Sequence, residues 1–246
     1  MRGRYEGAWN VVRFNWPKYL AGLCLIVVAF TSAAALPEDA FPLTVVALVA
    51  TTMVTLPLVV SHLIYDRSAL YDMPWLGTVM ETEPQRILNV NAGFDASSAI
   101  LRQRFPRSGS VVVDLYDPER FTEASILRAR RAYPAYPGTV QARQGTLPLQ
   151  TATVDLAVAF LSLHEARTHA DRVALLKEIR RTLKHDGRLV VTEHLRDVPN
   201  TLIFSFGVLH FHSLKAWTSA FRGSGFHLVG THRTAGFITT FILHPA

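Results

Sequence analysis

Two long apolar runs dominate the first quarter of the chain. They span Tyr19–Leu36 and Leu43–Leu63, contain no lysine, arginine, aspartate or glutamate, and are joined by a short turn that holds Glu38 and Asp39. At about 1.5 Å of rise per residue, the runs correspond to helices of roughly 27 and 31 Å, and a bilayer core is about 30 Å thick. The pattern therefore predicts a hairpin of two transmembrane helices.

The charges that flank the hairpin predict its orientation. Arg2, Arg4, Arg13 and Lys18 precede the first run against one acid, Glu6, whereas the connecting turn is acidic. Positive charge stays on the cytoplasmic side of a membrane. We therefore expect a multi-pass protein of the inner (cytoplasmic) membrane, with the globular part on the cytoplasmic side.

Aromatic residues beside the two runs are expected to lie at the level of the lipid headgroups. These residues are Trp16, Tyr19, Tyr65, Tyr71 and Trp75. The runs could also be a signal peptide cleaved after the first run, or a buried helical hairpin of a soluble protein. A second run of spanning length argues against the signal peptide, and the lack of a polar stripe argues against the buried hairpin.

From Pro84 onward, short apolar runs alternate with helical patterns, which is typical of a mostly parallel sheet with helices on both faces. The expected strands are 87–90, 111–115, 140–143, 154–161 and 188–193, the expected helices are 96–105, 118–132, 170–184 and 214–222, and an antiparallel pair is expected at 226–231 and 236–243. Asp95 or Ser97 would cap the first of these helices, and His185-Asp186-Gly187 would stop the third. The apolar segment 200–212 is too short to span a membrane, and it fits a lid, an interfacial membrane contact or plain core packing.

These patterns divide the chain into three parts. Residues 1–65 form a basic segment and two transmembrane helices (about 19–36 and 43–63), residues 66–83 a juxtamembrane linker, and residues 84–246 a doubly wound α/β domain. About 180 residues behind the hairpin are enough for one domain with a sizeable core.

Composition narrows the classes of partner. The single cysteine, Cys24, lies in the first apolar run, so a disulfide framework is excluded and a cysteine metal site is not expected. The net charge is +6, but the arginines are scattered in pairs without interleaved aromatic residues. This pattern argues against a nucleic-acid partner, and attraction to anionic lipids explains the charge more simply. We therefore expect membrane lipids as partners.

Three segments resemble the class I S-adenosylmethionine-dependent methyltransferases. Leu183–His194 (LKHDGRLVVTEH) is similar to the family's entrance into strand five, Val154–His164 (VDLAVAFLSLH) to its strand four, and Leu214–Phe226 to the helix before strand six. Ubiquinone/menaquinone-type and small-lipid methyltransferases look most similar. The resemblance covers roughly 84–243, and it implies a seven-stranded, mostly parallel sheet with S-adenosyl-L-methionine as cofactor.

The resemblance is weakest at the family's first motif, where a strand ends in an acid and a G-x-G-x-G turn follows. The matching stretch here reads NVNAGFD, so Asn89 replaces the acid, and Asn91 and Asp95 replace the first and third glycines. Only Gly93 is kept. The resemblance implies that these four residues bind the cofactor, and asparagine's tolerance of left-handed backbone angles predicts that the turn persists at Asn91.

The family's second motif is kept better. Asp114 ends the second expected strand, where the family's acid binds both ribose hydroxyls, and a carboxylate is well suited to accept from a diol. The alternative is that Asp114 or Asp117 only caps the following helix. Gly145 and Thr146 stand where the family contacts adenine.

Three polar residues follow the expected strands four and five. His164, Glu193 and His194 come at carboxyl ends, which line the ligand crevice of a doubly wound sheet, so these side chains could act as acid–base groups for a hydroxyl acceptor. Each could equally be a structural, hydrogen-bonded residue. His210 and His212 would share one side of an extended strand, but no third ligand at suitable spacing supports a metal site.

The sequence leaves three functions open. The first is a membrane-anchored methyltransferase that acts on a lipid-soluble acceptor such as a quinone, a phenolic compound or another lipid. The second is a methyltransferase-like binding or scaffolding subunit whose cofactor site is lost or altered, as the changes at Asn89, Asn91 and Asp95 suggest. The third is an enzyme of the same fold that uses the cofactor for another reaction.

Overall fold

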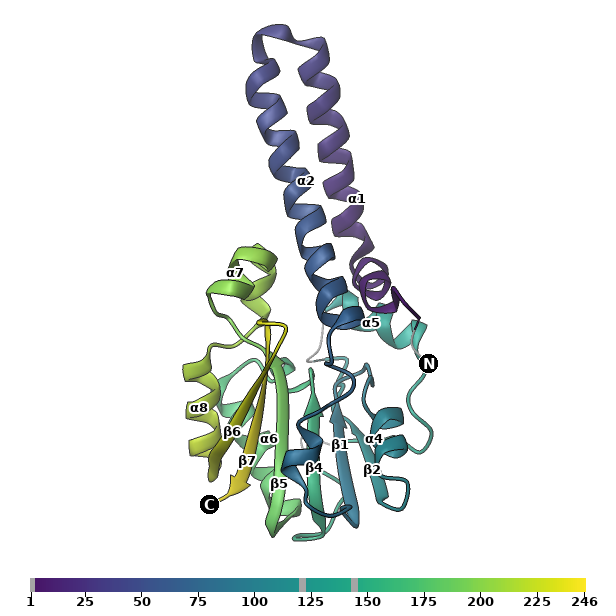
Figure 1. The fold of residues 1–246 in the computed structure, drawn as a ribbon, viewed down its shortest axis with the longest axis vertical. Helices are drawn as coiled ribbons and strands as arrows, with labels where there is room; N and C mark the ends of the chain where they lie inside the picture. Colours follow the sequence, from purple (N-terminus) through teal and green to yellow (C-terminus); the bar gives the residue numbers. More distant parts are fainter. Residues whose placement is uncertain (1–2, 120–122, 143–145) are drawn as a thin grey trace.

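A seven-stranded sheet lies beneath a long helical hairpin in the computed structural model, which describes residues 3–119, 123–142 and 146–246 (Figure 1). The strand order is β3-β2-β1-β4-β5-β7-β6, and β7 runs in the direction opposite to the other described strands. The strands are β1 (Arg86–Asn91), β2 (Gly109–Asp114), β3 (Val140–Gln141), β4 (Val154–Phe160), β5 (Leu183–His194), β6 (Phe226–Thr234) and β7 (Ile238–Pro245). The expected doubly wound, mostly parallel fold is confirmed.

Helices cover both faces of the sheet, so two separate cores form. On one face, α6 (His169–Thr182) and α8 (Leu214–Gly223) pack on the sheet through residues such as Leu176 and Trp217. On the other face lie α3 (Leu76–Val79), α4 (Ser98–Arg104) and the chain that precedes α3. Strand β4 is buried on both faces, as its run of small and branched residues predicts.

The residues expected as a linker, 66–83, form part of the second core. Leu70, Met73, Trp75 and Leu76 are buried against the sheet, and Tyr71 packs on Phe160 with ring centroids 5.6 Å apart. The prediction that Trp75 anchors at headgroup level is therefore wrong, because the chain after the hairpin turns back onto the sheet and buries this ring. Tyr71 is only half-buried there.

Two predicted helix boundaries are also wrong. Helix α5 (Ala124–Ala132) begins later than expected, because Asp117 accepts the Glu119 N–H at 3.0 Å and holds a turn there instead. Helix α6 ends at Thr182, before the expected stop at 185–187. Those three residues lie inside β5, whose first residue already pairs with β4. The segment 200–212 is mostly helical, as α7 (Val198–Phe204) and the 3₁₀ helix η4 (Ser205–His210).

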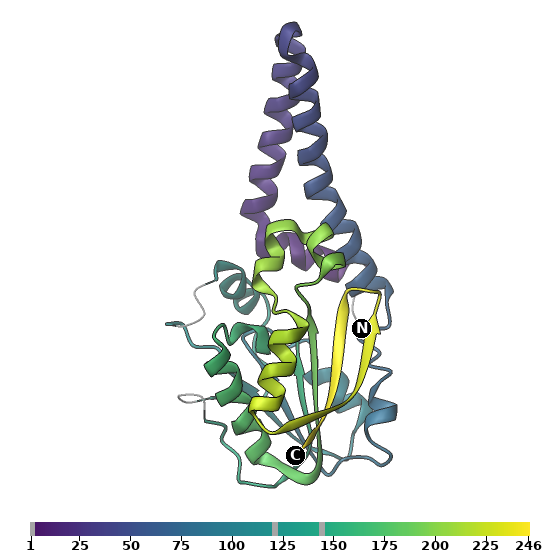
Figure 2. The same ribbon diagram turned by 90° about the vertical axis from the view of Figure 1, so that its left-hand side faces the viewer.

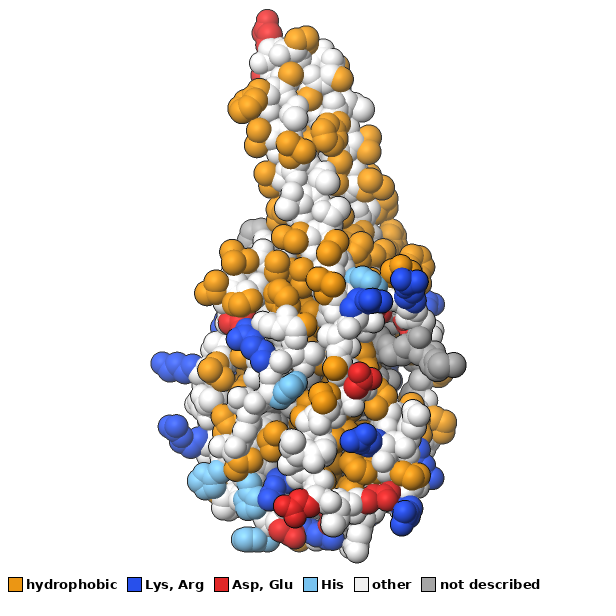
Figure 3. All heavy atoms as spheres, in the orientation of Figure 1, with side chains coloured by type: hydrophobic (Ala, Val, Ile, Leu, Met, Phe, Trp, Pro, Cys, Tyr) orange, Lys and Arg blue, Asp and Glu red, His pale blue; other side chains and the backbone are white. Residues whose placement is uncertain are grey.

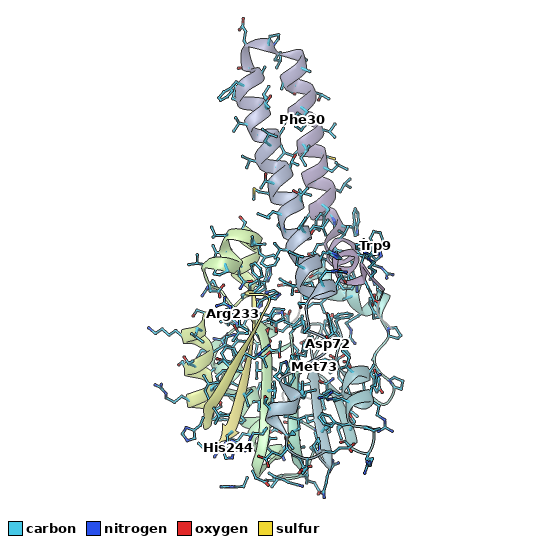
Figure 4. The ribbon with its side chains drawn as sticks, in the orientation of Figure 1. Trp9, Phe30, Asp72, Met73, Arg233 and His244 are labelled. Atoms are coloured by element: carbon cyan, nitrogen blue, oxygen red, sulfur yellow. The ribbon has the colours of Figure 1, made fainter. Side chains whose placement is uncertain are left out.

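The hairpin consists of α1 (Glu6–Ala35), a 3₁₀ turn η1 (Pro37–Asp39), α2 (Ala40–His62) and a π-helical turn η2 (Leu63–Arg67). Two of the described helical stretches, Glu6–Ala35 and Pro37–Arg67, are long and apolar enough to cross a membrane. Helix α1 is kinked at Asn15, two residues before Pro17, which lacks an amide donor. The kink turns Glu6–Phe14 across the top of the sheet domain, with Trp9 at its outer side (Figures 2 and 4).

Candidate active site

The predicted site residues lie at the carboxyl ends of the parallel strands, on the side of the domain from which the hairpin rises (Figure 1). Asn91 ends β1, Asp114 ends β2, and Glu193 and His194 end β5. Strands β1 and β4 are neighbours although two strands separate them in the chain, so the sheet order reverses here. Ligands of doubly wound sheets bind at such a reversal.

The loop after β1 keeps a tight turn, but the left-handed residue is Gly93, with φ +96°. Asn91 remains in the strand and pairs with Asp114, so the prediction of a left-handed Asn91 is wrong. A side chain at Gly93 would come within 3.0 Å of Ile126 and 3.2 Å of Arg130, both on α5. Glycine is therefore required because α5 packs directly on the loop.

Asn89 holds the loop from inside. Its amide donates to Ser98 Oγ at 2.7 Å and accepts from Ser97 Oγ at 3.0 Å, and the side chain is fully buried. Asp95 Oδ1 accepts from the backbone N–H groups of Ser97 and Ser98, at 3.0 and 2.9 Å, which caps α4 as expected. The side chain of Asn89 is thus occupied with the start of α4.

Two buried polar atoms of this loop have no hydrogen-bond partner among the described residues: Asn91 Nδ2, a donor, and Asp95 Oδ2, a carboxylate acceptor. Both residues line a small cavity of about 50 Å³ with Gly93 and Asp114. Buried polar groups are normally paired, so such atoms mark a place for a ligand. The amino-acid end of S-adenosylmethionine carries one carboxylate and one ammonium group, which this donor and this acceptor fit.

An ion pair closes the Asp114 side of the same cavity, where the resemblance places the ribose. Asp114 Oδ2 accepts from Arg130 Nη1 of α5, while its Oδ1 accepts the Tyr116 N–H at 2.9 Å. The guanidinium of Arg130 also stacks over the Tyr116 ring, 4.2 Å from its centroid. A cavity of about 50 Å³ is small beside the roughly 300–1,000 Å³ of ligand sites, so Arg130 must move before a nucleoside can reach Asp114.

Glu193 is the most strongly bound carboxylate of the site. Its Oε1 accepts three backbone N–H groups, from Ser162, Leu163 and His164, at 3.1, 2.8 and 3.1 Å. Its Oε2 lies 2.7 Å from His164 Nδ1, and His164 Nε2 lies 3.3 Å from Glu165 Oε1. His164, in the 3₁₀ turn η3 (Leu163–Glu165), is thus held between two carboxylates.

The tautomer of His194 follows from its partners. Asn200 Nδ2 donates to Asp197 Oδ1 at 2.8 Å and to the Phe237 carbonyl at 2.9 Å, so its Oδ1 must face His194 Nδ1, at 3.1 Å. Nδ1 therefore carries the hydrogen. Nε2 has the lone pair, which accepts from the Tyr65 hydroxyl at 2.7 Å.

The two histidines differ in charge at neutral pH. Burial by itself would lower the pKa of His164, but its interactions with Glu193 and Glu165 outweigh burial and raise this pKa to about 10. Burial lowers the pKa of His194 to about 4, against weaker opposing contributions that include the Asn200 hydrogen bond. His164 is therefore an imidazolium that cannot accept a proton, whereas His194 is neutral and can.

Two larger cavities lie at the same end of the sheet, and both are walled partly by the hairpin. The apolar cavity, of about 180 Å³, is lined by Gly7, Asn10, Val11, Phe14, Tyr65, Tyr71, Phe94, Ala96, Phe160 and Leu161. The histidine cavity, of about 230 Å³, is lined by Val11, Ser61, Tyr65, Leu161, His164, Glu193, His194, Phe204 and Phe211. Val11, Tyr65 and Leu161 line both, so the two cavities are neighbours.

Specific hydrogen bonds hold the first helical turns of α1 over these cavities. Asp66 accepts the N–H groups of Gly7 and Ala8 at 2.6 and 3.0 Å. Arg128 of α5 donates to the Phe14 carbonyl at 2.6 Å, next to the kink, and Tyr133 donates to Asn10 Oδ1 at 3.0 Å. The helix is therefore a fixed wall of the site.

Several residues of the site were not predicted from the sequence. Tyr65 was expected only as a membrane anchor, and Arg130 and Asn200 carried no separate signal. Asp197 caps α7 by accepting the Asn200 N–H at 3.1 Å, but this local pattern does not indicate that the Asn200 side chain contacts His194. Val11 of α1 is recognisable as part of the site only in three dimensions.

The other predicted residues lie elsewhere. Gly145 is outside the described residues, and Thr146 is exposed. His210 and His212 do not share a strand side, because His210 ends η4 and pairs with Glu123 at 2.6 Å. His212 instead lies 3.0 Å from Arg172 Nη1.

Comparison with known proteins agrees with this architecture. Residues 88–191 match the family described as a methyltransferase domain. A SAM-dependent methyltransferase from Aquifex aeolicus is 13% identical, with a TM-score of 0.53 over 77% of this chain and 98% of that chain. The mitomycin 7-O-methyltransferase MmcR is 16% identical (TM-score 0.53, 100% of this chain, 74% of that chain).

PigF with SAH is 17% identical (TM-score 0.50, 70% of this chain, 60% of that chain). No curated protein matches the chain. The strand order, the polar loop after β1 and the matched segment lead to one assignment: the sheet domain has the fold of the class I S-adenosylmethionine-dependent methyltransferases, and residues 88–191 match a methyltransferase domain.

Proposed function

We propose that this protein is a membrane-anchored methyltransferase that methylates a hydroxyl group, such as a phenolic hydroxyl, on a lipid-soluble acceptor. The observation that carries the proposal is the shared wall of the two larger cavities. Val11 of α1 and Tyr65 of η2 line both, beside the strand ends and His194. The reacting groups thus lie where the apolar hairpin joins the domain, which is where a lipid-soluble acceptor would concentrate.

The surface of the hairpin supports a membrane location. Large apolar side chains along both helices are exposed, including Leu25, Val28, Leu48 and Val49. Figure 3 shows apolar side chains distributed along the visible side of the hairpin, with charged atoms only at its tip. Exposing apolar surface to water costs about 25 cal/mol per Å², and contiguous apolar patches of this extent mark membrane or protein contacts.

The charges support a cytoplasmic domain. Glu38 and Asp39 lie at the tip of the hairpin, at the end far from the domain, as the red atoms at the top of Figure 3 show. Arg4, Arg13 and Lys18 flank its domain end. Under the positive-inside rule this distribution favours a hairpin whose tip faces outward.

When bound, S-adenosylmethionine supplies a methyl group activated by its sulfonium. Asn91 and Asp95 would hold its amino-acid end, and Asp114 would receive the ribose once Arg130 has moved aside. Nε2 of His194 can take a proton that leaves the acceptor hydroxyl, with Tyr65 passing its own proton on and receiving that of the acceptor.

The imidazolium of His164 also lines the histidine cavity, but it is paired with Glu193 and Glu165 and already holds its proton, so it cannot act as the base. Phe204 and Phe211 add apolar wall, and the Phe211 ring stacks on His194 with centroids 4.7 Å apart. Such surroundings exclude water from the reacting hydroxyl.

The test uses the full chain in lipid nanodiscs, S-adenosylmethionine labelled in its methyl group and a total lipid extract. We expect label in the organic phase and a loss of this transfer in Tyr65→Phe. Tyr5→Phe, at an exposed tyrosine outside the cavities, is the matched control. Label that appears only in water-soluble products, or equal transfer by both variants, would contradict the proposal.

One observation favours the alternative of a binding or scaffolding subunit, namely the Arg130–Asp114 pair on the ribose side. Calorimetry with S-adenosylhomocysteine separates the two functions. Binding that weakens in Asp114→Ala supports the methyltransferase, because a carboxylate that accepts two hydroxyls contributes about 2–3 kcal/mol. The absence of heat at millimolar ligand supports the scaffold.

A further inference from the structure

Helix α7 and the 3₁₀ helix η4 present apolar side chains outward. Val198, Leu202 and Leu209 are 72, 74 and 65% exposed, whereas Asn200 on the same segment is fully buried. Val198 and Leu202 are four residues apart, so they lie on one face of α7. Ile203 and Phe204 of the same helix pack against the core, but core packing does not explain why Val198 and Leu202 are exposed.

This apolar face continues that of the hairpin. Helix α7 contacts α2, and both views of the fold place α7 beside the hairpin, at the level where α2 leaves the domain (Figures 1 and 2). In Figure 3, apolar atoms form a collar at this level, and charged atoms lie mainly below it. Two exposed basic residues, Arg196 and Arg233, lie near the start of α7, where they could meet anionic headgroups.

The same segment is one wall of the histidine cavity. Ser61 and Tyr65, from the end of α2 and from η2, line the cavity together with Phe204 of α7 and with Phe211, which follows η4. The cavity that contains His194 thus lies between the base of the hairpin and the α7–η4 segment. Apolar rings on the inner side and exposed apolar residues on the outer side give this wall two apolar surfaces.

We infer that the α7–η4 segment (Val198–His210) lies in the headgroup boundary of the bilayer and that acceptors reach the histidine cavity sideways from the lipid, between α2 and α7. The occupant of the exposed face is a lipid surface. The segment is too short to span a membrane, which suits a helix lying in the interface. The inference rests on the proposed function, because it gives the route of the lipid-soluble acceptor.

Membrane contact is tested first, without any acceptor. In a Cys24→Ala background, Leu202→Cys is labelled with a fluorophore and the full chain is placed in phosphatidylcholine–phosphatidylglycerol vesicles that contain nitroxide-labelled lipid. Val229→Cys, at a 60% exposed residue of β6, is the control. We expect quenching and a blue shift at 202 and neither at 229. Equal emission at both positions would overturn the inference.

The route is tested with a cysteine inside the cavity, Ser61→Cys, in the same background. An alkyl maleimide dissolved in the vesicle lipid should label it, and a charged sulfonate thiol reagent added to the water should not. Labelling by the aqueous reagent alone would overturn the lateral route even if position 202 is quenched. Neither experiment requires methyl transfer, so both outcomes are independent of whether lipid extracts become labelled. Circular dichroism of each variant confirms that it is folded.

Discussion

Asp66 determines whether the first turns of α1 stay over the site. Its carboxylate is 1% exposed and accepts the first free N–H groups of the helix, those of Gly7 and Ala8, while its Oδ2 also lies 2.9 Å from His62 Nδ1. A negative charge at a helix N-terminus is favourable because unpaired N–H groups and the helix dipole both point at it. The chain supplies this cap from a residue about 60 positions away.

Replacing Asp66 with alanine removes both hydrogen bonds and the charge. A hydrogen bond to a charged group contributes about 1.5–3 kcal/mol, but the freed N–H groups regain water, so we expect a net loss of about 2–3 kcal/mol for the two together. At 1.4 kcal/mol per factor of ten, opening of Glu6–Phe14 should become about 30- to 150-fold more frequent. Asp66→Asn, which keeps one acceptor oxygen, should lie between alanine and wild type.

Hydrogen exchange of the full chain measures this opening directly. We expect protection to fall by that factor in 9–14 and to stay unchanged in β1 and β4. Asp72→Ala is the matched control, because Asp72 is an exposed aspartate of the same connecting segment (Figure 4). Gly7→Ala gives an independent check, since its added carbon would lie 2.3 Å from the Tyr65 Cβ. A change of less than about threefold, or equal loss throughout the sheet, would refute the reasoning.

Three further predictions concern the site. Tyr65→Phe leaves the Nε2 acceptor of buried His194 unpaired, so we expect about 1–3 kcal/mol less stability in thermal unfolding, and an unchanged unfolding profile would contradict the hydrogen bond. Arg130→Gln removes the ion pair with Asp114, which as a partly exposed pair contributes about 1 kcal/mol. S-adenosylhomocysteine should therefore bind the variant about fivefold more tightly in calorimetry, and weaker binding would mean that Arg130 contacts the ligand. The free energy of unfolding should fall as pH drops from about 6.5 toward 4, because unfolded His194 takes up a proton that folded His194 does not. It should also fall as pH rises from 6.5 toward 10, because folded His164 keeps a proton that unfolded His164 has lost, and this difference disappears above the folded pKa. Chemical denaturation across pH measures both changes, and His194→Gln should remove only the one below pH 6.5.

The fold was predictable because its signals are local. The run Val154–Phe160 consists of small and branched residues, as a strand buried on both faces requires, and it forms β4. Strand ends could likewise be located, so Asp114, Glu193 and His194 were placed correctly at one edge of the sheet. Boundaries were less predictable where side chains or strand pairing compete with a helix, as at Asp117.

The contacts between distant segments could not be read from the sequence. Arg130 pairs with Asp114 only because α5 packs on the glycine loop, and Tyr65 reaches His194 across 129 positions of the chain. Tyrosine beside an apolar run is typical of a membrane anchor, so the local pattern favoured a different role for Tyr65. Its place in the site depends on how the end of the hairpin meets β5.

The two histidines of the site show most clearly why residue type alone does not determine chemistry. His164 and His194 both follow strand ends and were equal candidates for the base. His164 lies between two carboxylates, and its pKa is raised to about 10. His194 is buried and contacts an amide and a phenol, and its pKa is lowered to about 4, so it is neutral at pH 7. The protonation state of each histidine is therefore determined by neighbours from other elements, and one neighbour of His194, Tyr65, lies at the base of the hairpin. Under the proposed function, the base of the hairpin is thus part of the catalytic site.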